Sequence, residues 1–176
     1  MIITFRKAIE KGEVVDCIGW DSNLLSLDGF SPKHGWIKVG LSKLYHIHRI
    51  YEVKRKNVQN LSTRKKSVEG RVKRYGERER NRSNDFLHKL TTELAKAFPN
   101  AIQGFEDLDK AGMYSKSKKH NRGISKQNWK GIINLMNYKS RIRLVDPRYI
   151  SSTCPLCGGK LIKLRGEKSL NAKGAD

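Results

Sequence analysis

Apolar and polar positions divide the first part of the chain into short strand-like runs. Residues 14–20 form a run rich in β-branched and aromatic residues, which predicts a buried strand ending at Asp21. Further apolar residues lie at 24–27 and 35–41, on either side of a turn signal at Asp28-Gly29. This pattern predicts a meander of strands beside the first one.

The longest polar stretch has the spacing of helices. Residues 43–98 are strongly charged and carry apolar residues at helical intervals, with Ser42 as the predicted N-cap. A break near residues 60–62 divides the stretch into two long helices, and Pro99 ends it.

The second half returns to alternating strands and helices. Residues 101–105 predict a strand that delivers Glu106, and residues 110–125 are polar, basic and glycine-containing, which predicts a mobile loop. Apolar residues at helical spacing within 129–138 predict an amphipathic helix packed on the sheet, and 141–145 predict a last strand. The order of elements indicates a mixed α/β fold in which helices cover a sheet.

Charge narrows the class of partner. The 176 residues contain 37 Lys and Arg against 17 Asp and Glu, a formal net charge of +20. Such an excess favours binding to a polyanion, because released counterions drive association with DNA or RNA. No apolar run is long enough for a membrane span, and the N-terminus lacks the pattern of a signal peptide. Three cysteines fit a reducing cytoplasm and not a disulfide framework, so we expect a cytoplasmic protein.

Basic side chains gather in two places. Residues 54–82 hold twelve Lys and Arg against three Glu, and the predicted loop holds a second group. Few aromatic residues interleave the first group, so phosphate contact is expected to outweigh base stacking there. The candidate nucleic-acid-binding residues are Lys54, Arg55, Lys56, Arg64, Lys65, Lys66, Arg71, Lys73, Arg74, Arg78, Lys118, Lys119 and Arg122.

Two acids follow predicted strands. Asp21 and Glu106 each come directly after a short apolar run, and acids at strand ends can meet at one edge of a sheet. Such a pair could hold two divalent cations about 4 Å apart, as in phosphodiester cleavage, and Mg²⁺ suits these oxygen ligands. The alternative is structural: Asp21 as a turn or cap residue, and Glu106 with Asp107 and Asp109 as the solvated start of a helix.

Cysteines near the end of the chain form half of a metal site. Cys154 and Cys157 are two residues apart and are followed by Gly158, which is the spacing of a zinc knuckle. Structural zinc takes four ligands, and no second pair follows. Zinc shared with a second chain and two free thiols therefore remain alternatives, of which free thiols are favoured for a monomer. The third cysteine, Cys17, is expected to be a buried core thiol.

Five segments occur in a fixed order along the chain. They are Cys17–Asp21, Gly104–Leu108, Trp129 with Tyr138-Lys139, Val145–Pro147 and Ile150–Gly158. Together they resemble the TnpB (OrfB) proteins of insertion sequences and their relatives, the type V CRISPR effectors. The resemblance extends over most of the chain.

The resemblance implies an RNase H-like fold of RuvC type. Residues 1–41 and 99–148 would form two parts of the core, with 42–98 as a basic helical insertion that contacts guide RNA and target DNA, and 149–176 as an incomplete zinc ribbon. Asp21 and Glu106 match the first two catalytic, Mg-binding acids of the family. Cys154 and Cys157 match the first half of its zinc ribbon.

The chain also departs from the family pattern. The second cysteine pair and the third acidic motif are absent, and Asp176 is not assigned to the missing role. The N-terminal domains of the family are absent as well, so the sequence is interpreted as a truncated copy. His88-Lys89 is expected to be ordinary helix surface.

Two classes of function follow. One is an RNA-guided DNA endonuclease that uses two Mg²⁺ ions. The other is a non-catalytic DNA- or RNA-binding remnant of such a nuclease, which the missing third acid favours for this chain alone. A truncated reading frame without a selected function is a third possibility.

Overall fold

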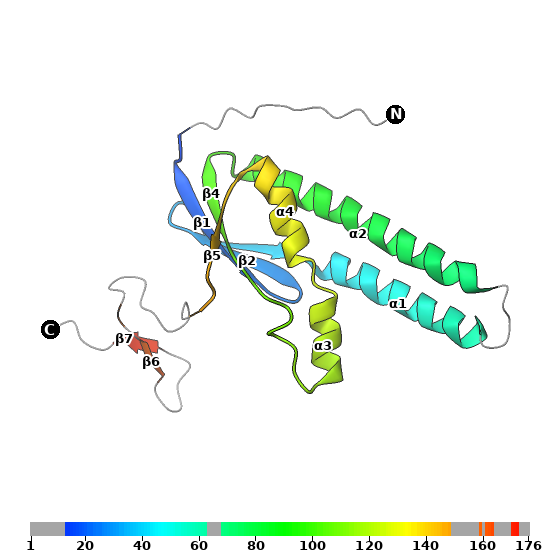
Figure 1. The fold of residues 1–176 in the computed structure, drawn as a ribbon. Helices are drawn as coiled ribbons and strands as arrows, with labels where there is room; N and C mark the ends of the chain where they lie inside the picture. Colours follow the sequence, from blue (N-terminus) through cyan, green and yellow to red (C-terminus); the bar gives the residue numbers. More distant parts are fainter. Residues whose placement is uncertain (1–12, 63–67, 149–158, 160, 164–169, 173–176) are drawn as a thin grey trace.

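The computed structural model describes residues 13–62, 68–148, 159, 161–163 and 170–172. Within this part, a five-stranded mixed sheet lies against long helices, and a separate short hairpin follows near the C-terminus (Figure 1). The predicted mixed α/β architecture is confirmed.

Five strands form the main sheet, in the spatial order β3-β2-β1-β4-β5. The first three are an antiparallel meander, and β1, β4 and β5 pair in parallel. Parallel pairing needs a crossover, and the helices supply it. The strands are β1 (Asp16–Ser22), β2 (Ser26–Ser31), β3 (Gly35–Gly40), β4 (Ala101–Glu106) and β5 (Arg141–Val145).

Four helices connect these strands. The helical segment predicted for 43–98 is observed as an antiparallel pair, α1 (Ser42–Ser62) and α2 (Glu69–Ala97), which extends away from the sheet in Figure 1. Helix α4 (Trp129–Lys139) packs beside α2, and α3 (Lys118–Ser125) precedes it. The small hairpin consists of β6 (Leu161–Lys163) and β7 (Leu170–Ala172).

The helices cover one face of the sheet, which we call the covered face. Ile18 and Trp20 of β1 are buried there with Phe105 of β4, and the Trp20 and Phe105 rings stack with centroids 6.3 Å apart. The Trp20 indole N–H donates to Oε1 of Gln103 at 3.1 Å, so the buried amide has a partner. The opposite face, which we call the open face, carries the alternate positions, including Gly19 and the exposed Asp21.

Three local predictions were wrong. Cys17 is exposed, because β1 alternates between the two faces and is not buried on both. Asp28-Gly29 lies inside β2 and makes no turn. Residues 110–125 are not all loop, because Ser117 accepts a hydrogen bond from the His120 N–H at 3.3 Å and caps α3.

Gly29 has a specific packing reason. It lies opposite Trp20 in the β1–β2 register, on the covered face, where the indole approaches the backbone closely. A Cβ at position 29 would lie 2.6 Å from both Cε3 and Cζ3 of Trp20. Glycine is therefore required here by the size of its cross-strand neighbour.

Gly29→Ala is accordingly expected to lower the free energy of unfolding by about 1–3 kcal/mol, because the core must shift to admit the methyl group. Denaturant titration followed by tryptophan fluorescence measures this loss. Gly40→Ala is the matched control, since nothing lies within 4 Å of an added Cβ there. Equal stabilities of the two variants would contradict the packing argument.

Candidate functional site: a carboxylate pair beside an open sheet face

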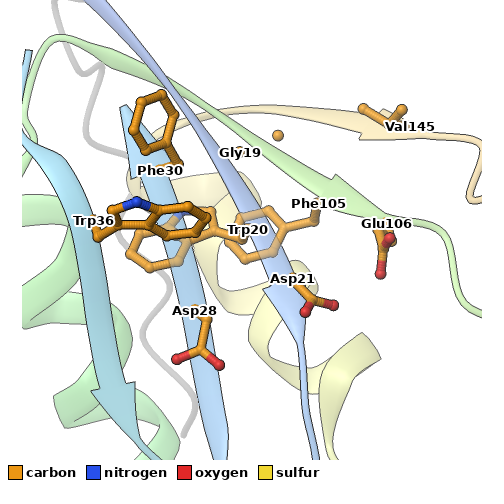
Figure 2. A pocket seen from close by; sticks show the side chains of 11 residues that line it. Gly19, Trp20, Asp21, Asp28, Phe30, Trp36, Phe105, Glu106 and Val145 are labelled. Carbon is orange, nitrogen blue, oxygen red and sulfur yellow. The ribbon is translucent and has the colours of Figure 1, made fainter. Parts of the chain in front are cut away.

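The two acids singled out from the sequence lie next to each other. Strands β1 and β4 are parallel and pair Trp20 with Phe105, so Asp21 and Glu106 occupy the next position on each strand. Both belong to the open face, and both line one cavity of about 420 Å³ (Figure 2). Asp21 is exposed, whereas Glu106 is partly buried.

Electrostatics differ between the two carboxyl groups. Burial raises the pKa of Glu106 above its ordinary value, and the negative charge of Asp21 raises that pKa further. An uncompensated pair of acids of this kind favours either a proton on Glu106 or a cation between the two groups. The pair therefore has the chemistry of a divalent cation site.

A third acid, Asp28, lies opposite Asp21 in the β1–β2 register. The Asn23 amide donates to Oδ2 of Asp21 at 3.0 Å and to Oδ2 of Asp28 at 2.8 Å, so it holds the two side chains in place. Ser26 Oγ also donates to Oδ2 of Asp28, at 2.8 Å. The other oxygen, Oδ1, is buried and accepts no hydrogen bond from the described part of the chain.

Sequence analysis missed both Asn23 and Asp28. Asp28 was interpreted as part of a turn and Asn23 was given no role, because the roles of both depend on a strand register that the sequence does not display. The only available signal was the local density of Asp and Asn after the first strand. Among the described residues, no group of three or more His, Cys, Asp or Glu is arranged to hold a metal ion.

The first group of candidate basic residues belongs to the far end of the α1–α2 pair. Lys54 Nζ lies 5.3 Å from the ring centroid of Tyr51 on α1 and 5.9 Å from that of Tyr75 on α2. Arg55 forms an ion pair with Glu79 of α2, so its charge is partly used within the protein. The other described candidates in this group are exposed, namely Lys56, Arg71, Lys73, Arg74 and Arg78.

The second group faces α1 from α3. Glu52 of α1 pairs with Arg122 at 3.3 Å and with Lys126, and the Lys126 hydrogen bond is the main cause that lowers the pKa of Glu52. A surface groove between the two helices is lined by Tyr45, Arg49, Glu52, Val53, Lys56, Lys119, Arg122, Gly123 and Lys126. Lys56 of the first basic group and Lys119 and Arg122 of the second thus line the same groove.

Arg49 and Lys126 were missing from the candidate list. The signal for Arg49 was available, because Tyr45, Arg49, Glu52 and Lys56 recur at the spacing of one helix face. Lys126 follows α3, whose position beside α1 could not be derived from the sequence.

A polar network holds the helices that carry this surface. His48 Nδ1 lies 2.7 Å from Oε1 of Glu79, and the Asn128 amide lies 3.2 Å from His48 Nε2. Burial, and then the positive charge of Lys126, lower the pKa of His48, which favours the neutral ring. Neutral Nε2 accepts from Asn128 while Nδ1–H donates to Glu79, so α1, α2 and the start of α4 are tied together.

Other sequence expectations have simple outcomes. His88 is exposed and Lys89 pairs with Asp85 at 2.8 Å, so both are helix surface as expected. Lys139 donates to Thr91 Oγ1 at 2.7 Å and to the His88 carbonyl at 2.9 Å, which fastens α4 to α2.

Several candidates lie outside the described residues: Arg64, Lys65, Lys66, Cys154 and Cys157. Asp176, to which no role was assigned, lies outside them as well. None of the described helices is both long enough and apolar enough to cross a bilayer.

The coupling of the two acids can be tested without any ligand. In Asp21→Asn, the pKa of Glu106 is expected to fall, because the neighbouring negative charge is gone. It should stay above the ordinary value of a glutamate, because burial, the larger cause, remains. Carbon-13 NMR titration of the Glu106 carboxyl group measures both effects. A pKa unchanged by the substitution would show that the two carboxyl groups do not sense each other.

The sequence is similar to those of several known proteins. No family model matches the sequence. The chain is similar to three proteins of Methanocaldococcus jannaschii. TnpB-like protein MJ1635 is 41% identical over 169 residues, which are 94% of this chain and 40% of the relative. TnpB-like protein MJ0012 is 46% identical over 96 residues, 54% of this chain and 46% of the relative. TnpB-like protein MJ0751 is 28% identical, over 92% of this chain and 63% of the relative.

Solved structures add a shared fold. A CRISPR-Cas12f ternary complex contains a chain that matches with a TM-score of 0.63 at 16% identity, over 89% of this chain and 33% of the other. A Cas12f1–sgRNA–target DNA complex matches with a TM-score of 0.55 at 18% identity, over 86% of this chain and 41% of the other. The chain therefore spans less than half the length of the two more identical relatives and of both structural neighbours.

Proposed function

Because the chain belongs to the TnpB-like family, we propose that it is a nucleic-acid-binding protein with an RNase H-like core of RuvC type. In this proposal Asp21 and Glu106 are two carboxylates of a divalent cation site for phosphodiester cleavage. The observation that carries the proposal is their adjacency at the ends of β1 and β4, on the face of the sheet opposite the one against which the described helices pack.

The residues present fit a hard divalent cation such as Mg²⁺. Two carboxylates lie side by side, the pKa of one is raised by burial and by the other, and Asp28 Oδ1 is buried without a hydrogen bond from the described residues. Carboxylate oxygens are the ligands such ions take, with waters and phosphate oxygens completing the shell. A bound pair of ions would supply an activated water and stabilise the leaving oxygen.

This chain's own residues prepare the site. Asn23 fixes the direction of Asp21 through its amide, and Glu106 ends β4 directly after the buried Phe105. The open face leaves room for a strand of nucleic acid to reach both acids. Nothing in this arrangement requires a side chain to move into place.

The partners proposed are DNA and RNA, including a guide RNA. The support is a net charge of +20 together with the Lys and Arg side chains that line the groove between α1 and α3. One structural neighbour is a complex of Cas12f1 with sgRNA and target DNA, which is consistent with such partners. The zinc role of Cys154 and Cys157 stays a prediction, since both lie outside the described residues.

A second candidate is binding without cleavage. It is favoured by one observation: Asp21, Asp28 and Glu106 line the cavity, but among the described residues no three potential ligands are arranged to hold a metal ion. Two-metal sites depend on their full ligand set, so the loss of a single ligand removes most of the activity.

The two candidates separate in a nicking assay. The isolated chain, with Mg²⁺ and labelled DNA, is expected to bind but to cleave little or not at all. The measurement is the fraction of nicked strand over time, beside Asp21→Ala and Glu106→Ala. Cleavage by the unaltered chain that either substitution abolishes would overturn the expectation and would show that a third ligand completes the site.

Binding itself has a sharper test. Lys118→Gln with Lys119→Gln should weaken binding at low salt and reduce the slope of log K against log salt by about 1.4–1.8, because two phosphate contacts are lost. The matched control is Lys89→Gln with Lys96→Gln, which removes equal charge from lysines paired to Asp85 and Glu93 on α2. Equal slopes for the two double variants would exclude α3 as a contact surface.

A further inference from the structure

We propose that the open cavity lined by Asp21 and Glu106, called the groove from here on, is a subsite for one unpaired nucleobase of a nucleic-acid single strand. The base would stack against Trp36. The inference rests on the proposed function and adds to it the chemical class of ligand next to the acids. Figure 2 shows Phe30 and Trp36, the aromatic side chains of the open face that line this cavity, on the side away from Glu106.

A pair of glycines forms the floor of the groove. Gly19 of β1 and Gly104 of β4 are neighbours in the parallel register, and both belong to the open face. Nothing lies within 4 Å of the position that a Cβ would take at Gly19, and at Gly104 the nearest atom is the Ile18 carbonyl oxygen at 3.6 Å. The fold therefore does not need glycine at position 19 for packing, and its absent side chain leaves space on the surface.

Aromatic side chains form the wall. Phe30 and Trp36 lie across β2 and β3 with ring centroids 5.2 Å apart and planes inclined by 60°. Trp36 is 83% exposed and Phe30 48% exposed, in contrast to Trp20, which is 3% exposed on the covered face. A tryptophan this exposed contributes little to the core, so its position is better explained by a ligand that covers it.

The dimensions suit a base attached to its sugar. The groove has a volume of about 420 Å³, within the range of small-ligand pockets. Phe30 pairs with Gly19, and Asp21 lies two residues further along β1, about 7 Å at the rise of a strand. A base on the glycine floor would thus direct its own phosphate toward the two acids.

The positive charge around the groove favours a nucleic acid over a second copy of this chain as the ligand. Lys38 and Arg143 are exposed and occupy open-face positions, Lys38 opposite Asp28 and Arg143 opposite Gly104, one on each side of the groove. A second copy of this chain would bring a net charge of +20 against an equal charge. A polyanion gains from both lysine and arginine contacts, and its bases supply the flat apolar surface that the groove fits.

The test uses Trp36 as its own reporter. Trp20 and Trp129 are 3% and 5% exposed, so fluorescence quenching by an oligonucleotide reports mainly on Trp36. An oligothymidylate of about ten nucleotides is compared with a strand of equal length that has abasic sites at its centre, in buffer with chelator. The thymidine strand should quench strongly and bind about fivefold to a hundredfold more tightly than the abasic strand.

Substitutions locate the effect. Trp36→Ala should bind both strands equally, measured by anisotropy of a labelled strand, because stacking is lost while phosphate contacts remain. Gly19→Val should fold normally, since its side chain meets open space, yet should lose the same preference by filling the floor. Thermal unfolding verifies the fold of each. Tyr138→Ala, an exposed aromatic on α4, is the matched control and should keep the full preference.

The outcomes are distinct. A preference for bases that survives Trp36→Ala and Gly19→Val would overturn the subsite, and so would equal binding of both strands by the unaltered chain. A dimer in light scattering that Trp36→Ala dissociates would overturn it as well, by showing that a second copy covers the face. Loss of salt-dependent binding to every strand would instead sink the proposed function itself.

Discussion

The parallel pairing of β1 with β4 is the constraint on which the rest of the structure depends. It brings Asp21 beside Glu106, which lies 85 residues further along the sequence. The pairing is held from the covered face, where Trp20 stacks on Phe105 and donates to the buried amide of Gln103. One side of each strand thus carries the packing energy, so the other side is free to carry acids and glycines that contribute little to stability.

Much of this could be predicted from the sequence, because apolar runs that end in an acid are local signals. The strands before Asp21 and Glu106 and the long charged helices were found in this way. Features that depend on register were not found. Cys17 was placed in the core because the run around it is mostly apolar, although a half-buried strand exposes every second residue. Asp28 was assigned to a turn because Asp-Gly favours turns. In the structure, however, glycine is needed at position 29 because the Trp20 ring leaves no space for a Cβ.

The basic surface shows the same division. Its lysines and arginines are evident from composition, and α1 and α2 from periodicity, whereas α3 lies where a loop was predicted. Which of them remain available for a ligand depends on long-range partners such as Glu79, which lies 31 residues from His48 and 24 from Arg55. No spacing rule relates such positions. A list of basic residues taken from the sequence therefore includes side chains, such as Arg55, whose charge is already paired within the fold.

The long helical pair has a mechanical consequence. Helix α2, with 29 residues, is about 44 Å long, and its C-terminal half packs on the sheet through Leu87 and Leu94. Further out, α1 and α2 bury a separate seam of their own, with Tyr51, Val58 and Val68. The α1–α2 pair is therefore anchored to the sheet at one end and extends away from it at the other. Residues could be inserted into or deleted from the far end of the pair, one helical turn at a time. Such changes would leave the strand register, and with it the spacing of the two acids, the same.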